Sequence, residues 1–276
     1  MKIVLAEKAG FCMGVRRAVD TCLALVEEGG YIATFGPLIH NPQVLEHLKK
    51  KGVHILEEMP ESIQGKVVVR AHGIPPQQKK QLRLAGADVR DATCPRVQKV
   101  QAIIKKYSGQ GYDTVIIGDK NHAEVLGLMG FAQGSVYVVS NIGDLEQLNM
   151  TDPFIVVSQT TQDKETFLKL SSLIRDCYPA CLIFNTICDS THRRQYEVLK
   201  LGGKVDAIVV VGGRGSANTR RLRELAEGMG KSVFLVESED EIDPVSLAGF
   251  TSIGVTAGAS TPSWVIDRVV KVLEGI

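Results

Sequence analysis

Short aliphatic segments alternate with longer segments of helical periodicity along the whole chain, and this alternation restricts the possible folds more than any other feature. The aliphatic segments end in Gly, Asn or Ser and have the length of buried strands. The sequence therefore predicts an α/β fold with mainly parallel sheets. The expected strands are 32–36, 66–71, 114–118, 154–158, 206–212 and 252–256, and the expected helices include 15–27, 42–51, 97–107, 162–175 and 219–230.

A repeated order of strand ends divides the chain. In each repeat one strand runs into a polar loop before a helix, and a second strand also ends in polar residues. In the first two repeats a third strand end carries a cysteine, Cys94 or Cys188, whereas the last repeat has none. The N-terminal strand 2–6, which leads into Cys12, supplies the missing piece. We therefore expect three α/β units related by a pseudo-threefold axis, formed by residues 13–95, by residues 96–189, and by residues 190–276 together with 1–12.

The polar strand ends of the repeats are predicted to share one site. Ligands of open parallel sheets bind at the carboxyl ends of the strands, so three units facing a common centre would bring these loops together. Neutral donors and protonatable imidazoles suit an anion such as diphosphate, and the helix N-termini that follow would add amide donors. The candidate residues are His40, His72, His122, Thr160, Ser216, Asn218 and Ser260.

Glu124 is the carboxylate placed between a loop histidine, His122, and the start of a helix. One interpretation is that it caps this helix or complements its dipole, which favours acidic residues in the first turn. The other is that burial beside an anionic ligand keeps the side chain protonated, so that it can donate a proton at neutral pH. The sequence leaves both interpretations open.

Three cysteines, one for each repeat, are candidate cluster ligands. Cys12, Cys94 and Cys188 lie at the same kind of strand end, and three converging thiolates could hold three irons of a [4Fe–4S] cluster. An electron-transfer cluster normally has four cysteine ligands, so three would leave one iron open to act as a Lewis acid on a substrate. Two alternatives stay open: three cysteines buried as small apolar side chains, and a zinc site completed by His or Glu.

The remaining cysteines of the six have structural roles in our interpretation. Cys22 falls on the helix after Cys12, and Cys177 and Cys181 are separated by three residues. A radical-SAM loop would need a further cysteine at the position of Phe184, and no Cys-x-x-Cys pair occurs in the chain.

Composition excludes several classes of function. The 32 basic and 31 acidic side chains leave a formal charge of +1, which argues against a protein that grips a nucleic-acid backbone. Apolar runs such as 207–211 are strand-sized, and charges at Glu7 and Lys8 interrupt the N-terminal apolar stretch. We therefore expect a cytoplasmic protein that neither spans nor enters a membrane and whose thiols stay reduced.

One motif favours a different chemistry. The segment from Gly213 to Asn218 follows a strand and is similar to the Gly-x-Gly-x-x-Gly loop of dinucleotide-binding proteins, with Glu237 at the end of the next strand. Asn218 stands at the third glycine position, however, and the other repeats carry polar residues in the matching loop. Nucleotide binding is therefore the less favoured interpretation.

The ordered set of motifs closely resembles the LytB/IspH family over essentially the full length. The motifs are Gly10-Phe-Cys-Met-Gly-Val-Arg16, Gly36-Pro-Leu-Ile-His-Asn41, Arg70-Ala-His-Gly-Ile74, Ala92-Thr-Cys-Pro95, Gln159-Thr-Thr161, Asn185-Thr-Ile-Cys188 and Thr256-Ala-Gly-Ala-Ser260. Members of this family are 4-hydroxy-3-methylbut-2-enyl diphosphate reductases, which act in the last step of the methylerythritol phosphate route to isoprenoid precursors. Each motif alone is weak, but their order is highly specific.

The resemblance implies a trefoil of three α/β domains around a central, oxygen-sensitive iron–sulfur cluster. By position, Cys12, Cys94 and Cys188 match the cluster ligands, Glu124 matches the proton donor, and the seven His, Thr, Ser and Asn candidates match the substrate-binding positions. Ala217 stands where many relatives have serine, and Gly215 replaces a common asparagine. One hydroxyl contact to the diphosphate is therefore expected to be absent or replaced by backbone.

The implied reaction removes the allylic hydroxyl with two electrons and two protons, giving isopentenyl and dimethylallyl diphosphate. The electrons are expected from ferredoxin, flavodoxin or a similar carrier, because the chain has no convincing flavin or nicotinamide site. Two other classes are kept. A non-redox hydro-lyase could use the same three-cysteine cluster, and a nucleotide-dependent oxidoreductase could use the loop from Gly213 to Asn218.

Overall fold

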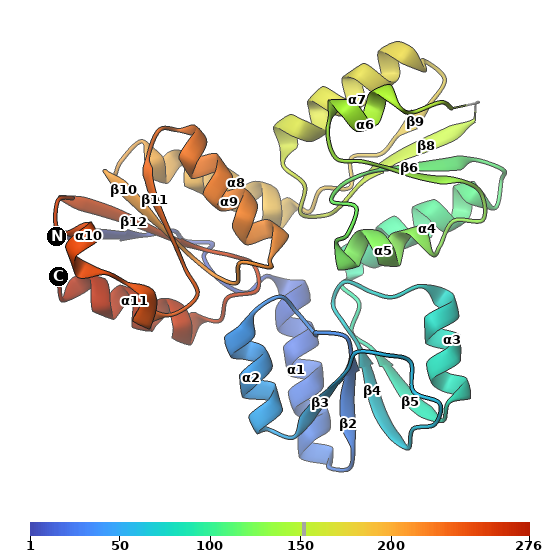
Figure 1. Cartoon of the computed structure of the whole chain (residues 1–276), viewed down its shortest axis with the longest axis horizontal. Coiled ribbons are helices and arrows are strands. Elements are labelled where there is room, and N and C mark those ends of the chain that lie inside the picture. Colours follow the sequence, from blue (N-terminus) through green and yellow to red (C-terminus); the bar gives the residue numbers. More distant parts are fainter. Residues whose placement is uncertain (151–152) are drawn as a thin grey trace. The chain divides into compact units, whose positions relative to one another are not determined.

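A computed structural model of the chain, which describes residues 1–150 and 153–276, contains three four-stranded sheets (Figure 1). Neighbouring strands are parallel in every sheet. This confirms the prediction of three α/β units with parallel sheets. Strands end within two residues of the predicted positions; for example, the strand expected at 66–71 spans Gly65–Val69, so that Arg70 and Ala71 lie in the loop beyond it.

The first sheet has the order β3 (Val53–Leu56), β2 (Ile32–Phe35), β4 (Gly65–Val69) and β5 (Ala87–Asp91). The second has the order β7 (Val136–Val139), β6 (Asp113–Ile117), β8 (Phe154–Ser158) and β9 (Leu182–Ile183). The third has the order β11 (Ser232–Val236), β10 (Ala207–Val211), β12 (Ser252–Ala257) and β1 (Lys2–Leu5). The N-terminal strand β1 pairs with β12 and so completes the sheet of the last repeat, as the repeat predicts.

The helices connect these strands. They are α1 (Met13–Glu28), α2 (Pro42–Lys50), α3 (Pro76–Leu84), α4 (Pro95–Ser108), α5 (Ala123–Met129), α6 (Ile142–Glu146), α7 (Lys164–Cys177), α8 (Asp189–Gly202), α9 (Ala217–Gly228), α10 (Pro244–Leu247) and α11 (Ser263–Glu274), with one 3-10 turn at Glu239–Glu241. Among the described residues, none of these helices combines the length and the apolar character that crossing a membrane requires.

Alternating aliphatic side chains of the central strands form the cores. In β10, Val209 and Val211 face the apolar side of α11, whereas Ile208 and Val210 pack with residues of α8 and α9. Because side chains of a strand point alternately to opposite faces, a strand covered by helices on both faces needs an uninterrupted aliphatic run. This explains why these strands are recognisable in the sequence.

The chain forms two compact units. The terminal unit consists of residues 1–16, 39–47 and 189–276 and contains the third sheet; the central unit consists of residues 17–38 and 48–188 and contains the first and second sheets. The domain boundaries predicted at 95/96 and 189/190 stay a prediction.

Candidate functional site

The same backbone hydrogen bond holds a cysteine in each repeat. The Cys94 N–H donates to the Ala71 carbonyl at 2.9 Å, and the Cys188 N–H donates to the Thr160 carbonyl at 2.9 Å. The Cys12 N–H donates to the Ala259 carbonyl at 3.0 Å. Each of these carbonyls lies two residues beyond the end of a central strand, namely β4, β8 or β12. The repeat that the sequence shows is therefore a repeat of local geometry.

Each of the three cysteines also immediately precedes a helix. The side chains of Cys12, Cys94 and Cys188 are half-buried, and α1, α4 and α8 begin at the next residue. In the first of these, the Val15 N–H points at the Cys12 sulfur, with 3.5 Å between N and Sγ. The positive end of a helix dipole favours an anionic group, so this position suits a thiolate ligand.

The other three cysteines lie in different settings. Cys22 on α1 is fully buried, and burial raises the pKa of its thiol to about 11. Cys181 is buried in the core of the second sheet, and Cys177 is exposed at the end of α7. Cys22 and Cys181 are therefore core residues and Cys177 is not, and the structural roles expected for the three stay a prediction.

In the central unit, a continuous series of contacts connects the predicted site residues. Glu124 is 2% exposed, and both of its carboxylate oxygens accept hydrogen bonds from Thr160: Oε1 from the backbone N–H at 2.6 Å and Oε2 from the hydroxyl at 2.8 Å. The Glu124 N–H donates to His122 Nδ1 at 3.1 Å, which makes His122 the N-cap of α5. The His122 and His72 rings meet edge to face, with 5.4 Å between their centroids.

This series ends at a cysteine on both sides. Thr160 accepts from the Cys188 N–H, and His72 follows Ala71, which accepts from the Cys94 N–H. The helix α5 lies close to the His72 loop, because a Cβ on Gly127 would come within 3.3 Å of the Gly73 carbonyl. The central unit therefore brings together six of the predicted residues: Cys94, His72, His122, Glu124, Thr160 and Cys188.

The terminal unit holds the other predicted residues. The Ser260 hydroxyl donates to the His40 carbonyl at 3.1 Å, and Ser260 directly follows Ala259, the partner of Cys12. The His40 carbonyl also lies against the loop before α9, since a Cβ on Gly213 would come within 2.7 Å of it. Ser216 is the N-cap of α9, accepting from the Thr219 N–H at 3.4 Å.

Asn218, in the first turn of α9, is the clearest sign of a missing ligand. Its side chain is 3% exposed, and neither its amide oxygen nor its amide nitrogen has a hydrogen-bond partner among the described residues. Buried polar groups are nearly always hydrogen-bonded, and leaving one unsatisfied is costly. A polar ligand that meets this amide would remove the cost.

The nucleotide-binding interpretation gains no support from the loop between Gly213 and Asn218. Glu237, the proposed ribose ligand, accepts from the Arg214 N–H at 2.6 Å and forms an ion pair with the Arg214 side chain at 3.3 Å. The same guanidinium pairs with Glu241 at 2.7 Å. Both carboxylates therefore bind Arg214 of this loop, and Glu237 is already engaged within the protein.

Two arginines that the sequence did not single out support the cysteine loops. On α1, Arg17 donates to the carbonyl of Thr93, the residue before Cys94, at 2.9 Å. On α8, the buried Arg194 donates to the Gly10 carbonyl at 2.6 Å and to the Ser190 carbonyl at 3.1 Å. No sequence signal distinguishes these arginines, because each bonds to a backbone carbonyl of a distant segment.

Comparison with known proteins yields consistent matches. The LytB protein family matches residues 3–274. The chain is similar to the 4-hydroxy-3-methylbut-2-enyl diphosphate reductases of Solidesulfovibrio magneticus (41% identity, covering 99% of both chains) and Geotalea daltonii (40% identity, covering 100% of this chain and 98% of the relative).

Solved structures agree with these matches. The structure of the E-1-hydroxy-2-methyl-but-2-enyl-4-diphosphate reductase from Plasmodium falciparum is 28% identical with a TM-score of 0.94, covering 99% of this chain and 87% of that one. A structure described as (E)-4-hydroxy-3-methyl-but-2-enyl diphosphate reductase, the terminal enzyme of the non-mevalonate pathway, is 36% identical with a TM-score of 0.72 and full coverage of both chains.

Proposed function

Because the chain belongs to the LytB family, we propose that it reduces 4-hydroxy-3-methylbut-2-enyl diphosphate. The reaction breaks the allylic C–O bond, consumes two electrons and two protons, and releases water. Its products are isopentenyl and dimethylallyl diphosphate, so the enzyme acts at the end of the non-mevalonate pathway. The relatives that carry this name match over nearly the whole chain.

The proposed cofactor is a [4Fe–4S] cluster with Cys12, Cys94 and Cys188 as its three protein ligands. LytB proteins are iron–sulfur enzymes in general, and the donor set fits such a group. The three cysteines are half-buried, their backbone N–H groups make equivalent hydrogen bonds, and each lies at the start of a helix. When bound, the cluster supplies the electrons and an iron open to the substrate.

Glu124 is the proposed proton donor. A carboxylic acid that is 2% exposed and lies within 2.8 Å of a hydroxyl can pass its proton along that contact without exchange with bulk water. In the structure the Thr160 hydroxyl donates to Oε2. With Glu124 protonated at Oε2, the hydroxyl would turn to accept that proton and would pass its own proton to the departing oxygen. The second contact, from the Thr160 N–H to Oε1, fixes the carboxyl group for this transfer.

The proposed substrate ligands are neutral donors and imidazoles: His40, His72, His122, Thr160, Ser216, Asn218 and Ser260. The unsatisfied amide of Asn218 supports this assignment most directly, since its nitrogen can donate to a phosphate oxygen. Ser216 and Asn218 both lie at the N-terminus of α9, where backbone amides and the helix dipole favour an anion.

The single observation that carries the proposal is the contact series from Cys94 through His72, His122, Glu124 and Thr160 to Cys188. It connects two proposed cluster ligands, two proposed diphosphate ligands and the proposed acid within one compact unit.

The test is turnover of the diphosphate substrate by anaerobically prepared enzyme, with dithionite-reduced methyl viologen as electron source and analysis of the products. We expect both isopentenyl and dimethylallyl diphosphate, and only when the reductant is present. Turnover without reductant would support the hydro-lyase instead. Activity that requires NAD and survives replacement of Cys94 by serine would support the nucleotide-dependent enzyme.

The proposed electron donor is a ferredoxin- or flavodoxin-type carrier, because the substrate must receive two electrons and the nucleotide-like loop of this chain is closed by its own ion pairs.

A further inference from the structure

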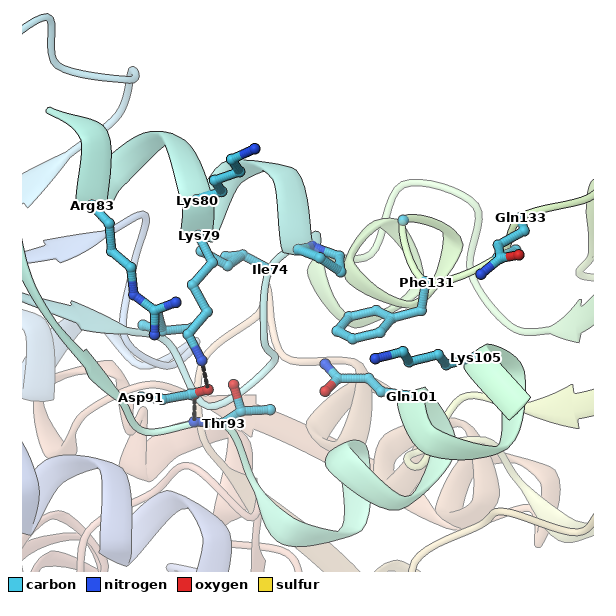
Figure 2. A pocket seen from close by; sticks show the side chains of 14 residues that line it. Ile74, Lys79, Lys80, Arg83, Asp91, Thr93, Gln101, Lys105, Phe131 and Gln133 are labelled. Atoms are coloured by element: carbon cyan, nitrogen blue, oxygen red, sulfur yellow. Dashed lines mark hydrogen bonds and ion pairs between the residues drawn. The ribbon is translucent and has the colours of Figure 1, made fainter. Parts of the chain in front are cut away.

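A pocket of about 470 Å³ in the central unit lies outside the proposed substrate site (Figure 2). One wall is α3, which carries Lys79, Lys80 and Arg83, and another is α4, which carries Gln101 and Lys105. Figure 2 shows Phe131, from the segment after α5, between these two walls. The pocket is therefore formed by α3, by α4 and by the segment after α5, all within the central unit.

The lining of this pocket is strongly cationic. Asp91 is its one carboxylate among the lining residues, and Asp91 is already paired with Lys79 at 2.6 Å. Burial tends to raise the pKa of Asp91, but hydrogen bonds from Lys79 and Thr93 have the larger combined effect and leave that pKa below its ordinary value. The Asp91 carboxylate therefore stays charged and paired with Lys79.

The other three cations are available to a partner. Within the described part of the chain, the side chains of Lys80, Arg83 and Lys105 form no ion pair, and all three are exposed. Three uncompensated positive charges therefore surround one pocket in a chain whose formal net charge is only +1. Such a concentration attracts an acidic surface and accelerates its association.

The floor of the pocket lies next to Cys94, one of the proposed cluster ligands. Thr93 lines the pocket, and Cys94 is the following residue. Gly73, which follows His72, packs against the same floor: a Cβ there would lie 2.5 Å from the Gln101 amide nitrogen and 3.1 Å from the Thr93 methyl. A molecule seated in this pocket would therefore contact Thr93, the residue before Cys94.

We propose that this pocket is the docking face for an acidic one-electron carrier protein, which delivers electrons through the segment that ends at Cys94. The inference rests on the proposed function, in which each turnover consumes two electrons and the carrier is oxidised by one electron at each visit. Two visits per turnover require fast and reversible encounters, and such small, weak interfaces are typical of electron-transfer partners. Charge complementarity supplies the encounter rate without tight binding.

The test compares two electron sources with the same cluster-loaded enzyme. The double variant Lys80→Glu and Arg83→Glu reverses two exposed charges and leaves the Lys79–Asp91 pair in place. With reduced ferredoxin as the carrier at low ionic strength, we expect kcat/KM for the carrier to fall at least about ten-fold. With reduced methyl viologen, a small cation that needs no docking face, kcat should equal that of the unmodified enzyme. The salt dependence of the carrier reaction should also become weaker in the variant.

Two control variants show whether the loss is specific to this pocket or follows from any change of surface charge. Lys169→Glu, on the exposed face of α7, changes the net charge of the central unit without touching the pocket and should leave both reactions unchanged. The pair Lys200→Glu and Lys204→Glu alters a second basic pocket, in the terminal unit, and should also be silent.

The proposal is overturned if the double variant keeps the unmodified kcat/KM for the carrier, or if the terminal-unit pair produces the loss instead. It is equally overturned if the double variant loses only the binding of a small anion such as inorganic diphosphate. Failure of the proposed function would look different, because the unmodified enzyme would then show no viologen-driven reduction of the substrate.

Discussion

Replacement of Glu124 by glutamine distinguishes a role of this residue in proton delivery from a role in the stability of the fold. In the Glu124→Gln variant the amide oxygen still accepts from the Thr160 N–H, and the amide nitrogen donates to the Thr160 hydroxyl, which can turn to accept. Both contacts of 2.6 and 2.8 Å therefore survive in altered form. The loss in the free energy of unfolding should stay within about 1–2 kcal/mol, roughly the net contribution of one hydrogen bond.

The effect on catalysis should be much larger. The variant has no transferable proton at this position, and general acid catalysis contributes roughly 10²–10⁴-fold, which corresponds to about 3–5 kcal/mol of barrier. We expect kcat with reduced methyl viologen to fall by that factor, with a smaller change in KM. Urea unfolding of the same preparation gives the stability change.

The matched pair of hydroxyl variants tests the path of the proton. Thr160→Val keeps the backbone N–H bond to Glu124 but removes the hydroxyl, so kcat should fall as well. Thr161→Val removes the neighbouring hydroxyl, which bonds to Gln159, and should leave kcat within a few-fold of the unmodified value. A Glu124→Gln variant that turns over at nearly the unmodified rate under strong reductant would refute the reasoning, and the acid would have to be sought elsewhere.

Three further outcomes are expected. Asn218→Ala should raise KM for the diphosphate substrate about ten-fold or more without lowering the free energy of unfolding, because the amide that it removes has no hydrogen-bond partner among the described residues. A clear loss of stability with unchanged KM would contradict this. Arg194→Met should cost about 3 kcal/mol in urea unfolding and lower the iron content, whereas the exposed neighbour variant Arg193→Met should do neither. Hydrogen bonds from Thr251 and Ser252 hold the pKa of Asp206 at about 2, so its contribution to stability is present above about pH 4 and is lost as the pH falls toward 2. Asp206→Asn should therefore lose less stability than the unmodified chain between pH 5 and pH 2.5, and equal losses would exclude this role.

The central strands could be predicted from the sequence because helices cover both of their faces. β10 is a continuous aliphatic run, and β6 and β8 each contain three consecutive aliphatic residues. The order of the repeats also predicts that β1 belongs to the third sheet, where it pairs with β12. The edge strand β3 was not among the predicted strands. Two of its four residues, His54 and Ile55, are exposed, so its sequence lacks the uninterrupted apolar run that identifies the inner strands.

The candidate site likewise has a part that could be predicted from the sequence and a part that could not. Positions such as Cys94 and His72 could be predicted because parallel strands place their carboxyl ends at one edge, and repeats place equivalent residues at equivalent ends. The two hydrogen bonds from Thr160 to Glu124 could not be predicted, since they join residues 36 apart in the sequence through side-chain and backbone donors that no local pattern specifies. The same is true of Arg194 and Gly10, which are 184 residues apart. Local patterns identify the loops, and only the fold shows which side chains fix them.

The most direct test of the cluster assignment is iron and sulfide analysis with Mössbauer spectroscopy of anaerobically purified protein. It should compare the unmodified chain with Cys188→Ser and with the matched core variant Cys181→Ser. We expect roughly four irons per chain in the unmodified protein, one of them spectroscopically distinct because it lacks a cysteine ligand. Cys181→Ser should retain this signature and Cys188→Ser should lose it. Full iron content with an unchanged spectrum in Cys188→Ser would contradict the central claim that the equivalent strand-end cysteines hold the cluster.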